Sequence, residues 1–397
     1  MELTETDRDH LRHALQLAER GRGRVSPNPL VGAVVVRDDA VIGEGFHAEL
    51  GGLHAERAAL ADCRERGEDP AGATMYVSLE PCAHQGRQPP CVEALLKAGI
   101  ARVVIASEDP SEKAAGRGPG ILRDGGIAVE FAAGAEAAAA RLLNQPFRKH
   151  SRTGLPLVTL KLAISLDGQT ATALGDSPWI SGEQSRALVH RWRAEADAIA
   201  AGIGTVLADD PLLTARAENA RQPLRVVFDS QARLPLGSQL LATLDQSPLL
   251  VVAGPEAESE RIDALRGAGA EVYVAVEADP VARIEPVLAA LGRRGITSLF
   301  LEGGRTLAAA FQAADQLDES RTFVAPLLLG GGPATSTLPR AGGPGGQAEN
   351  ENLARRPAPP GQDPRAGAPG PARRSAITSS TERVGEDVLM IARYKEW

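Results

Sequence analysis

The sequence has few aromatic residues, few cysteines and no long apolar run. Phe, Trp and Tyr together make up 3% of the 397 residues. The three cysteines, Cys63, Cys82 and Cys91, are too few to staple a chain of this length, so they indicate metal binding or chemistry. No apolar stretch of about 18 residues occurs, and the first residues lack the basic and apolar segments of a signal peptide. We therefore expect a cytoplasmic protein that does not span a membrane.

The charge balance limits the partners that the chain can bind. The formal net charge is −8, which argues against broad binding of nucleic acids or anionic membranes. Few aromatic residues are available for base stacking. These features favour a small-molecule substrate, and any phosphate on it must be held by a local cluster of arginines. The apolar content of 43% is ample for buried cores, which excludes wholesale disorder.

Length and residue pattern predict two α/β domains. At roughly 100–200 residues per domain, the chain is long enough for two. Segments of strand length alternate with helical patterns, which is typical of layered α/β domains with partly parallel sheets. The polar segment 147–156 breaks this alternation, so we expect domains over residues 1–150 and 151–397. The predicted strands are 31–36, 41–45, 74–79, 103–106, 157–162, 224–228, 249–253, 272–276, 298–301 and 384–391.

Residues 333–380 fit neither domain. Pro, Gly, Ala and Arg dominate this segment, and Leu338 and Leu353 are its only large apolar residues up to residue 375. Such a sequence buries too little apolar surface to offset its ordering entropy. Two interpretations stay open, a disordered insertion and a compensated reading-frame error in the gene.

One set of residues has the composition of a catalytic zinc site. His54 and Glu56 begin a predicted helix, while Cys82, preceded by Pro81, and Cys91 follow a predicted strand. One imidazole and two thiolates supply three tetrahedral ligands and leave the fourth position for water. Glu56 can take a proton from that water and pass it to a leaving amine. This order of residues is that of the zinc deaminases.

Two nearby residues have competing interpretations. His84 lies between the two cysteines and is either a rival ligand or a residue that faces substrate or solvent. Cys63 lies on the helix after His54, and we expect it to be an inert thiol in the core.

The second half contains two weaker features. Arg186, His190 and Arg193 recur at helical spacing, with Arg216 beyond them, and form either a phosphate grip or a solvated helix face. The segment 302–304 lies between a strand and a helix, where we expect either a plain turn or a site for a dinucleotide pyrophosphate.

Motifs in both halves resemble one family, the bifunctional pyrimidine deaminase/reductase of riboflavin biosynthesis. The deaminase half is similar in Asn28-Pro29-Leu30-Val31-Gly32 and in the wide cysteine spacing with Gly-Arg-x-Pro-Pro inside it, although Gln88 stands where the family usually has Thr. The reductase half is similar in Ser-Leu-Asp-Gly from Ser165, in Gly-x-Ser-x-Trp-Ile from Gly175, and in Glu-Gly-Gly from Glu302. The resemblance covers residues 5–332 and the tail from about 380.

The resemblance implies a cytidine-deaminase-like α/β/α sandwich followed by a dihydrofolate-reductase-like α/β domain. It implies one Zn²⁺ per chain, bound by His54, Cys82 and Cys91, with Glu56 as the proton shuttle. It implies NADPH contacts at Ala163, Trp179, Thr205, Asp209, Ser230, Gly304, Arg305, Thr306, Leu307, Ala308, Ala309 and Ala310. It implies substrate contacts at Asn28, Ser177, Arg193, Leu213, Arg216 and Glu302.

Two of the residues in the predicted sites keep an alternative. Asn28 either hydrogen-bonds the pyrimidine or is a turn residue before Pro29. Lys161 is a further catalytic candidate, because an ammonium near the ribose carbonyl polarises it for hydride attack, and its alternative is a strand-edge lysine.

The resemblance also implies two consecutive reactions. The first domain would deaminate 2,5-diamino-6-ribosylamino-4(3H)-pyrimidinone 5′-phosphate to 5-amino-6-(5-phosphoribosylamino)uracil. The second would use NADPH to reduce the ribosyl group, which gives 5-amino-6-(5-phosphoribitylamino)uracil. The alternative is a deaminase only, with a reductase domain disabled by residues 333–380. We expect a homo-oligomer that acts on phosphorylated pyrimidines.

Overall fold

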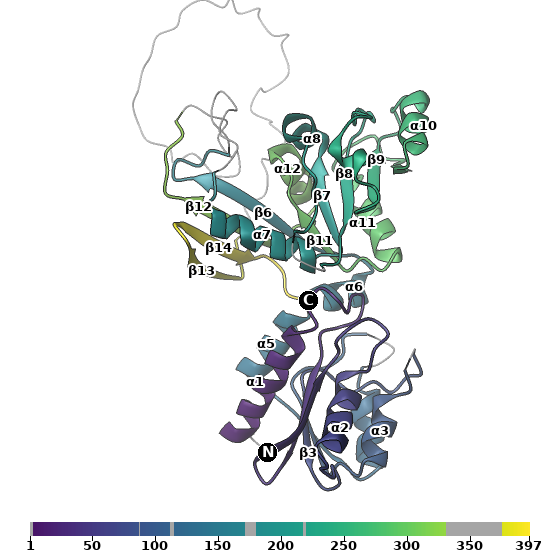
Figure 1. The fold of residues 1–397 in the computed structure, drawn as a ribbon, viewed down its shortest axis with the longest axis vertical. Coiled ribbons are helices and arrows are strands. Elements are labelled where there is room, and N and C mark those ends of the chain that lie inside the picture. Colours follow the sequence, from purple (N-terminus) through teal and green to yellow (C-terminus); the bar gives the residue numbers. More distant parts are fainter. Residues whose placement is uncertain (1–2, 87, 112–114, 171–179, 217–219, 331–374) are drawn as a thin grey trace, which may run out of the picture.

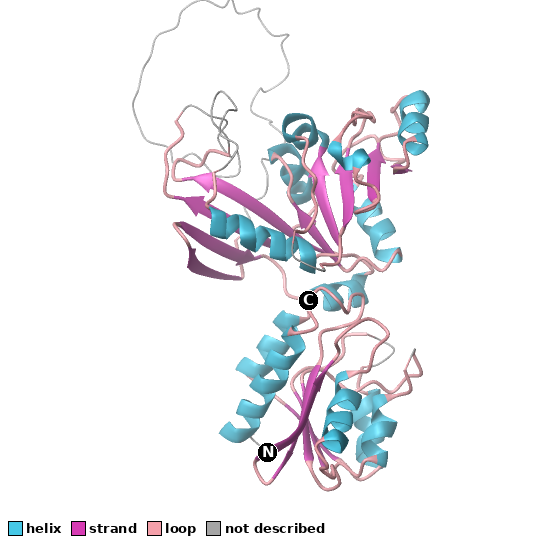
Figure 2. Cartoon of the chain, viewed as in Figure 1, coloured by secondary structure: helices cyan, strands magenta, loops and turns pink. Residues whose placement is uncertain are grey.

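The molecule consists of two lobes that meet at a narrow waist (Figure 1). The computed structural model describes residues 3–86, 88–111, 115–170, 180–216, 220–330 and 375–397. Each lobe contains a β-sheet flanked by helices (Figure 2). No helix in these ranges combines the length and the apolar character needed to cross a membrane.

The N-terminal lobe is built on a five-stranded sheet with the order β2-β1-β3-β4-β5. Strand β1 pairs antiparallel with β2 and β3, whereas β3, β4 and β5 are parallel. The elements of this lobe are α1 (Glu5–Glu19), β1 (Gly32–Arg37), β2 (Ala40–Phe46), α2 (Ala55–Glu65), β3 (Thr74–Val77), α3 (Cys91–Lys97), β4 (Arg102–Ile105), α4 (Arg117–Asp124), β5 (Ala128–Phe131) and α5 (Ala135–Leu143).

Alternate residues of the central strands face two different cores. Val35, Met75 and Val103 pack with side chains of α2, α3 and α4 on one face of the sheet. Val34 and Val104 pack with α1 and α5 on the other face. Side chains of a strand alternate between faces, so apolar residues at consecutive positions require helices on both sides. The lobe is therefore a three-layer α/β/α sandwich.

The C-terminal lobe is built on a nine-stranded sheet with the order β10-β9-β8-β7-β11-β6-β12-β14-β13. Its strands are parallel from β10 to β12, and β14 and β13 add antiparallel. The strands are β6 (Leu157–Ser165), β7 (Ala198–Gly202), β8 (Leu224–Phe228), β9 (Leu249–Ala253), β10 (Glu271–Val274), β11 (Ser298–Leu301), β12 (Glu319–Ala325), β13 (Thr378–Val384) and β14 (Asp387–Arg393). The helices are α7 (Glu183–Glu195), α8 (Ile203–Asp209), α9 (Gln239–Ala242), α10 (Ser259–Gly267), α11 (Ile284–Arg293) and α12 (Arg305–Ala313).

This sheet also buries both of its faces. Val189 and Trp192 of α7 lie in the core on one face, together with residues of α8, α9 and α10. Leu288 of α11 and Phe311 of α12 lie in the core on the other face. The predicted α/β class is confirmed in both lobes.

The sequence prediction missed four strands that carry little apolar pattern. β5 and β13 are half-exposed or exposed along most of their length, and β7 and β12 are rich in small or polar residues. β13 begins at Thr378, so the expected atypical segment 333–380 overlaps this strand. The expected single strand 384–391 covers the last residue of β13, the turn and most of β14. Residues 331–374 lie outside the described ranges, so the structure tests neither interpretation of that segment.

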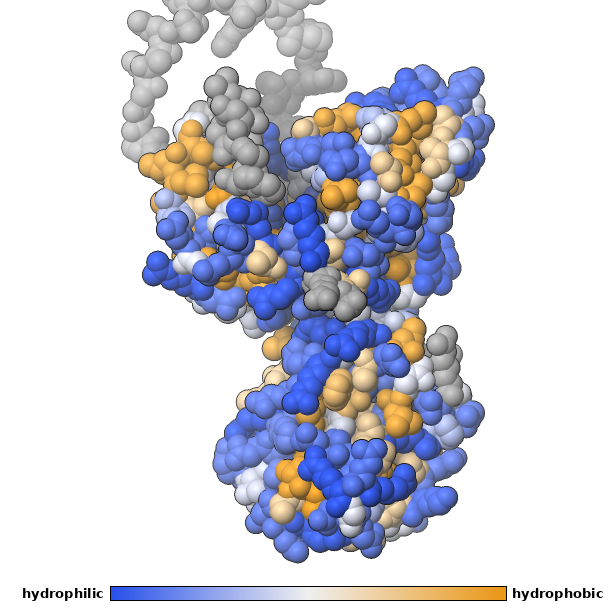
Figure 3. All heavy atoms as spheres, viewed as in Figure 1, coloured by the Kyte–Doolittle hydropathy of each residue, from blue (hydrophilic) through white to orange (hydrophobic). Residues whose placement is uncertain are grey.

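The waist contains a helix where the sequence analysis expected a polar break. Helix α6 (Gln145–Thr153) spans the expected boundary at residues 150 and 151, and its Arg148 and Lys149 are each only 1% exposed. Arg148 pairs with Glu108 of the N-terminal lobe at 2.6 Å, and Lys149 pairs with Asp318 of the C-terminal lobe at 2.6 Å. A buried charge needs a partner, so these two cations tie one lobe to the other. Figure 3 shows hydrophilic side chains around the waist on the face in view.

We expect Lys149→Met to destabilise the chain strongly. Asp318 is 1% exposed, and without the ammonium it becomes an uncompensated buried carboxylate, which costs about 3–5 kcal/mol. Denaturant unfolding at neutral pH measures this loss. Arg266→Ala is the control, because it removes the exposed pair with Asp263 and should cost less than about 1 kcal/mol. Equal, small effects of the two substitutions would contradict the assignment.

Candidate active sites

Three potential metal ligands converge at the N-termini of two helices. His54 is the N-cap of α2, Cys91 is the first residue of α3, and Cys82 lies in the loop after β3. The Nδ1 atom of His54 lies 3.5 Å from Sγ of Cys82 and 3.3 Å from Sγ of Cys91. These three ligand atoms all lie within 4.8 Å of one another.

This donor set fits a zinc ion. With Zn–S near 2.3 Å and Zn–N near 2.0 Å, the N and S corners of a tetrahedron are separated by roughly 3.5 Å. The observed N–S distances agree with this value. His84 lines the neighbouring pocket and is not part of the ligand cluster found among the described residues. Cys63 lies on α2 and its side chain is fully buried in the core between this helix and the sheet, as expected for an inert thiol.

The position of α2 depends on two glycines of β2. A Cβ atom at Gly43 would lie 2.3 Å from Sγ of Cys63, and one at Gly45 would lie 2.3 Å from the backbone nitrogen of Ala59. Only glycine allows this close approach of helix to strand. The N-terminus of α2, which carries His54 and Glu56, is thereby fixed against the sheet.

Glu56 lies in the first turn of α2 and is 3% exposed. Burial, together with the charge of Cys82, raises the pKa of Glu56 to about 7. The hydrogen bonds from Cys91 and from His54 lower the pKa of Cys82 to about 4, so this sulfur is a thiolate. A buried carboxyl group with a pKa near neutrality can both accept and release a proton, as a general acid–base catalyst must.

A cavity of about 340 Å³ opens beside these residues. Asn28 lies in the wall of this cavity, where its amide nitrogen donates a hydrogen bond to Nε2 of His47 at 3.1 Å. The other ring nitrogen of His47, Nδ1, lies 2.9 Å from the carbonyl oxygen of Leu53. Burial lowers the pKa of His47, which favours a neutral ring. This arrangement leaves the carbonyl oxygen of Asn28 as the group to face a ligand. Four polar side chains that line the cavity were not predicted from the sequence, and these are His47, Glu80, Asp109 and Ser111.

The predicted reductase residues gather where parallel strands end. Glu302 directly follows β11, and both oxygens of its carboxylate accept hydrogen bonds from Arg193 of α7, at 2.5 and 3.0 Å. Lys161 lies on the adjacent strand β6, and burial lowers its pKa while the charge of Glu302 opposes this shift. Ligands of open α/β sheets bind at the carboxyl ends of the strands, and Glu302 lies at such an end.

The expected NADPH contacts lie along the same edge of the sheet. Gly304 is the N-cap of α12, and a Cβ atom placed there would find Oγ1 of Thr205 as its nearest neighbour, at 3.6 Å. Arg305 and Thr306 are exposed in the first turn of α12, and the N-terminus of a helix is a favourable position for a pyrophosphate. Asp209 and Ser230 are also exposed.

Other predicted contact residues differ in how accessible they are. Ala163, Leu307 and Ala310 are half-buried, and Ala309 is exposed. The side chains of Ala308 and Leu213 pack in the core, so these two residues can offer only backbone atoms to a ligand. Ser177 and Trp179 lie outside the described residues.

The arginine stripe on α7 is only partly available for a phosphate. The guanidinium of Arg193 binds Glu302 and also donates to the carbonyl of Thr214 at 3.2 Å. Arg186 donates to the carbonyl of Ser181. Burial and the charges of Arg193 and Arg216 lower the pKa of His190, and Arg216 is exposed.

Two family models match different parts of the chain. The cytidine and deoxycytidylate deaminase zinc-binding region matches residues 4–107, and the RibD C-terminal domain matches residues 156–344. A zinc-dependent deaminase is therefore joined to a reductase in one chain, and the cofactors are Zn²⁺ and NADPH.

Relatives span nearly the whole chain. The riboflavin biosynthesis protein RibD of Actinobacillus pleuropneumoniae is 38% identical, with 98% of this chain and 95% of the relative covered. RibD of Escherichia coli is 40% identical over 82% of this chain and 89% of the relative. The structure of Acinetobacter baumannii RibD superposes with a TM-score of 0.78 at 35% identity, covering 98% of this chain and 99% of that one. The chain belongs to the RibD family, whose members are bifunctional deaminase–reductases of riboflavin biosynthesis. Nothing in these comparisons favours the deaminase-only alternative.

We expect the purified protein to hold about one zinc ion per chain, because three ligands of this type form a stable site. Cys82→Ser and Cys91→Ser should each remove the metal, as measured by atomic emission after dialysis. Cys63→Ala is the control and should retain it, because this thiol lies in the core. Full zinc content in both ligand variants would overturn the assignment.

Proposed function

We propose that the N-terminal lobe removes the 2-amino group of 2,5-diamino-6-ribosylamino-4(3H)-pyrimidinone 5′-phosphate and that the C-terminal lobe reduces the ribosyl group of the product with NADPH. The observation that carries this proposal is the cluster of His54, Cys82 and Cys91 with the buried Glu56 beside it. A Thermotoga maritima structure titled diaminohydroxyphosphoribosylaminopyrimidine deaminase/5-amino-6-(5-phosphoribosylamino)uracil reductase supports the choice of substrates, with a TM-score of 0.77 at 31% identity over 98% of this chain.

In the deaminase, Glu56 moves the protons. When bound by His54, Cys82 and Cys91, zinc supplies the Lewis acidity that makes water nucleophilic at neutral pH. The carboxylate of Glu56 accepts the proton of the attacking water and then donates a proton to the departing nitrogen, so that ammonia leaves. Asn28, held by His47, accepts a hydrogen bond from the pyrimidine through its carbonyl oxygen.

Glu56→Gln should abolish most deamination while leaving the metal in place. The amide keeps the size of the side chain but cannot carry a proton, so turnover should fall by about 10²-fold or more. Ammonia release under saturating substrate measures this loss, and zinc content and NADPH oxidation with the deaminated substrate are the controls. Near-normal ammonia release would mean that another group moves the protons.

In the reductase, Lys161 and Glu302 face the reacting sugar. NADPH, when bound along the edge formed by Thr205, Gly304 and Ser230, supplies the hydride. In the ribosylamino group, C1′ is bonded to nitrogen and to the ring oxygen, so the C1′–O4′ bond breaks and leaves an iminium group at C1′, to which the hydride adds. The ammonium of Lys161 donates its proton to the departing ring oxygen. Burial lowers the pKa of Lys161, which makes the transfer of its proton to that oxygen easier. The charge of Glu302 keeps the lysine protonated before the reaction.

We assign the substrate phosphate mainly to Arg216. Arg193 already forms a bidentate pair with Glu302, so we assign to it the orientation of that carboxylate and an added positive charge. Arg216 is exposed, so a phosphate can approach its guanidinium.

Arg216→Ala should raise KM for the phosphorylated pyrimidine in the reductase assay by roughly 10- to 150-fold, because a charge-assisted hydrogen bond is lost. KM for NADPH should stay within about 2-fold. The dephosphorylated substrate should lose little from the same substitution, and this cycle isolates the pairwise contact. Arg191→Ala, which changes an exposed residue of α7, is the control. Equal losses with both substrates would show that Arg216 does not hold the phosphate.

A cytoplasmic location and a homo-oligomeric state stay predictions from the sequence. Sedimentation of the purified chain measures the second of these.

A further inference from the structure

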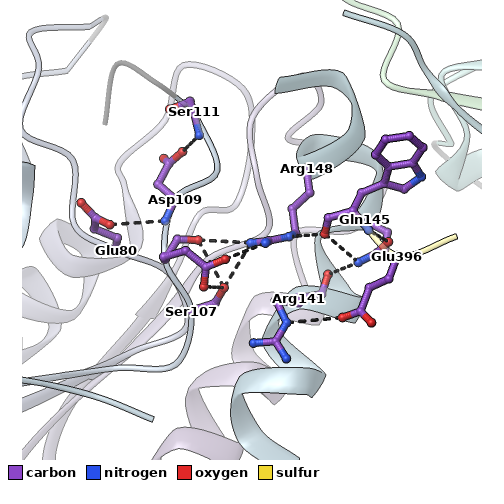
Figure 4. Close-up of polar contacts among 10 residues, drawn as sticks. Glu80, Ser107, Asp109, Ser111, Arg141, Gln145, Arg148 and Glu396 are labelled. Atoms are coloured by element: carbon purple, nitrogen blue, oxygen red, sulfur yellow. Dashed lines mark hydrogen bonds and ion pairs between the residues drawn. The ribbon is translucent and has the colours of Figure 1, made fainter. Parts of the chain in front are cut away.

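One wall of the deaminase cavity is a short segment attached to the waist of the molecule. Asp109 and Ser111, in the segment 107–111 after β4, line the cavity. The amide of Asp109 donates to Glu80 at 3.4 Å, and the amide of Ser111 donates to the carboxylate of Asp109 at 2.8 Å (Figure 4). These contacts shape the segment on the cavity side and connect it to the loop before the ligand Cys82.

On its other side, the same segment is held by one buried arginine. Arg148 of α6 donates to the hydroxyl of Ser107 at 3.3 Å and to the carbonyl of Glu108 at 3.2 Å, and it pairs with the carboxylate of Glu108 at 2.6 Å (Figure 4). Its Nε donates to the carbonyl of Trp397, in the segment that follows β14 of the C-terminal lobe. The arginine thus joins a wall of one active site to the other lobe.

Trp397 is itself fixed from several directions. Its backbone nitrogen donates to Gln145 at 2.9 Å, and its indole nitrogen donates to the buried Asp318 at 3.0 Å. The carbonyl group of Trp397 that accepts the hydrogen bond from Arg148 is therefore held in place by other contacts of the same residue.

A second segment that lines the cavity is attached directly to the C-terminal lobe. The hydroxyl of Ser26, two residues before Asn28, donates to the fully buried carboxylate of Asp197 at 2.7 Å. Asp197 precedes β7 of the C-terminal lobe. Two segments that line the deaminase cavity thus depend on contacts with the reductase lobe.

We propose that Arg148 is a positioning residue for deamination, through which the C-terminal lobe fixes the cavity wall formed by residues 107–111. This inference rests on the proposed deamination. Arg148 touches no ligand in this account, and it acts by holding Asp109 and Ser111 where a substrate meets them. Small displacements of groups that orient a substrate reduce turnover strongly, so a residue outside the cavity can govern activity within it.

The test compares three variants of the full-length chain. Arg148→Met keeps the length and burial of the side chain but removes its donors, and we expect kcat/KM for deamination to fall roughly 10- to 100-fold, mostly through KM. Arg148→Lys retains the charge and can reach one acceptor, so it should recover part of this loss. Arg141→Ala is the matched control, because it cuts the exposed contact with Glu396 at 3.4 Å without touching the segment. Zinc content and reductase turnover should stay unchanged in all three.

A second measurement separates positioning from general destabilisation. Amide hydrogen exchange should accelerate in a peptide covering residues 107–111 in Arg148→Met and stay unchanged in one covering β3. Unchanged deamination kinetics in Arg148→Met would overturn the proposal, and so would an equal loss of both activities. Deamination by the unaltered chain tests the proposed function itself. A failure of the proposed deamination can therefore be distinguished from a failure of the positioning role of Arg148.

Discussion

Two adjacent buried cations on α6 hold the molecule together. Arg148 reaches into the N-terminal lobe and Lys149 into the C-terminal lobe, and neither has contact with bulk solvent. The Lys149 ammonium also lies 5.3 Å from the ring centre of Trp397, whose backbone binds Arg148. An uncompensated charge in such surroundings is costly, so only an arrangement of the lobes that satisfies both cations is stable. The buried ion pairs at the waist therefore favour one orientation of the two lobes, and with it one arrangement of the two active sites.

The two lobes use different parts of the α/β architecture for their chemistry. The deaminase places His54, Glu56 and Cys91 at the N-termini of α2 and α3, and the third metal ligand, Cys82, in the loop after β3. The reductase places Lys161, Glu302 and the start of α12 along the edge where parallel strands end. In each case rigid elements carry the reacting groups, and loops complete the walls that meet the substrate.

The sequence predicted the zinc cluster because the metal restricts its ligands to a few residue types in a recognisable order. Most buried strands were predicted for a similar reason, since runs of large apolar residues leave few alternatives, whereas the buried strand β7 was missed because it consists mostly of Ala and Gly. By contrast, His47 and Asp109 reach the cavity only through tertiary packing, and no local pattern marks them. β13 is an exposed edge strand with a polar sequence, so it resembled the atypical segment before it. Arg148 and Lys149 suggested a solvated linker, because sequence alone does not show that their partners lie in separate lobes.

The central claim is that one chain performs a hydrolytic deamination and then an NADPH-dependent reduction. The most direct measurement follows ammonia and NADP⁺ together after the diaminopyrimidine ribotide is added to the purified protein. Without NADPH, the account predicts stoichiometric ammonia release and accumulation of the deaminated ribosyl compound. With NADPH, ammonia and NADP⁺ should form in equal amounts, with ammonia appearing first. Oxidation of NADPH that precedes ammonia release, or that continues when deamination is blocked and no deaminated substrate is supplied, would contradict it.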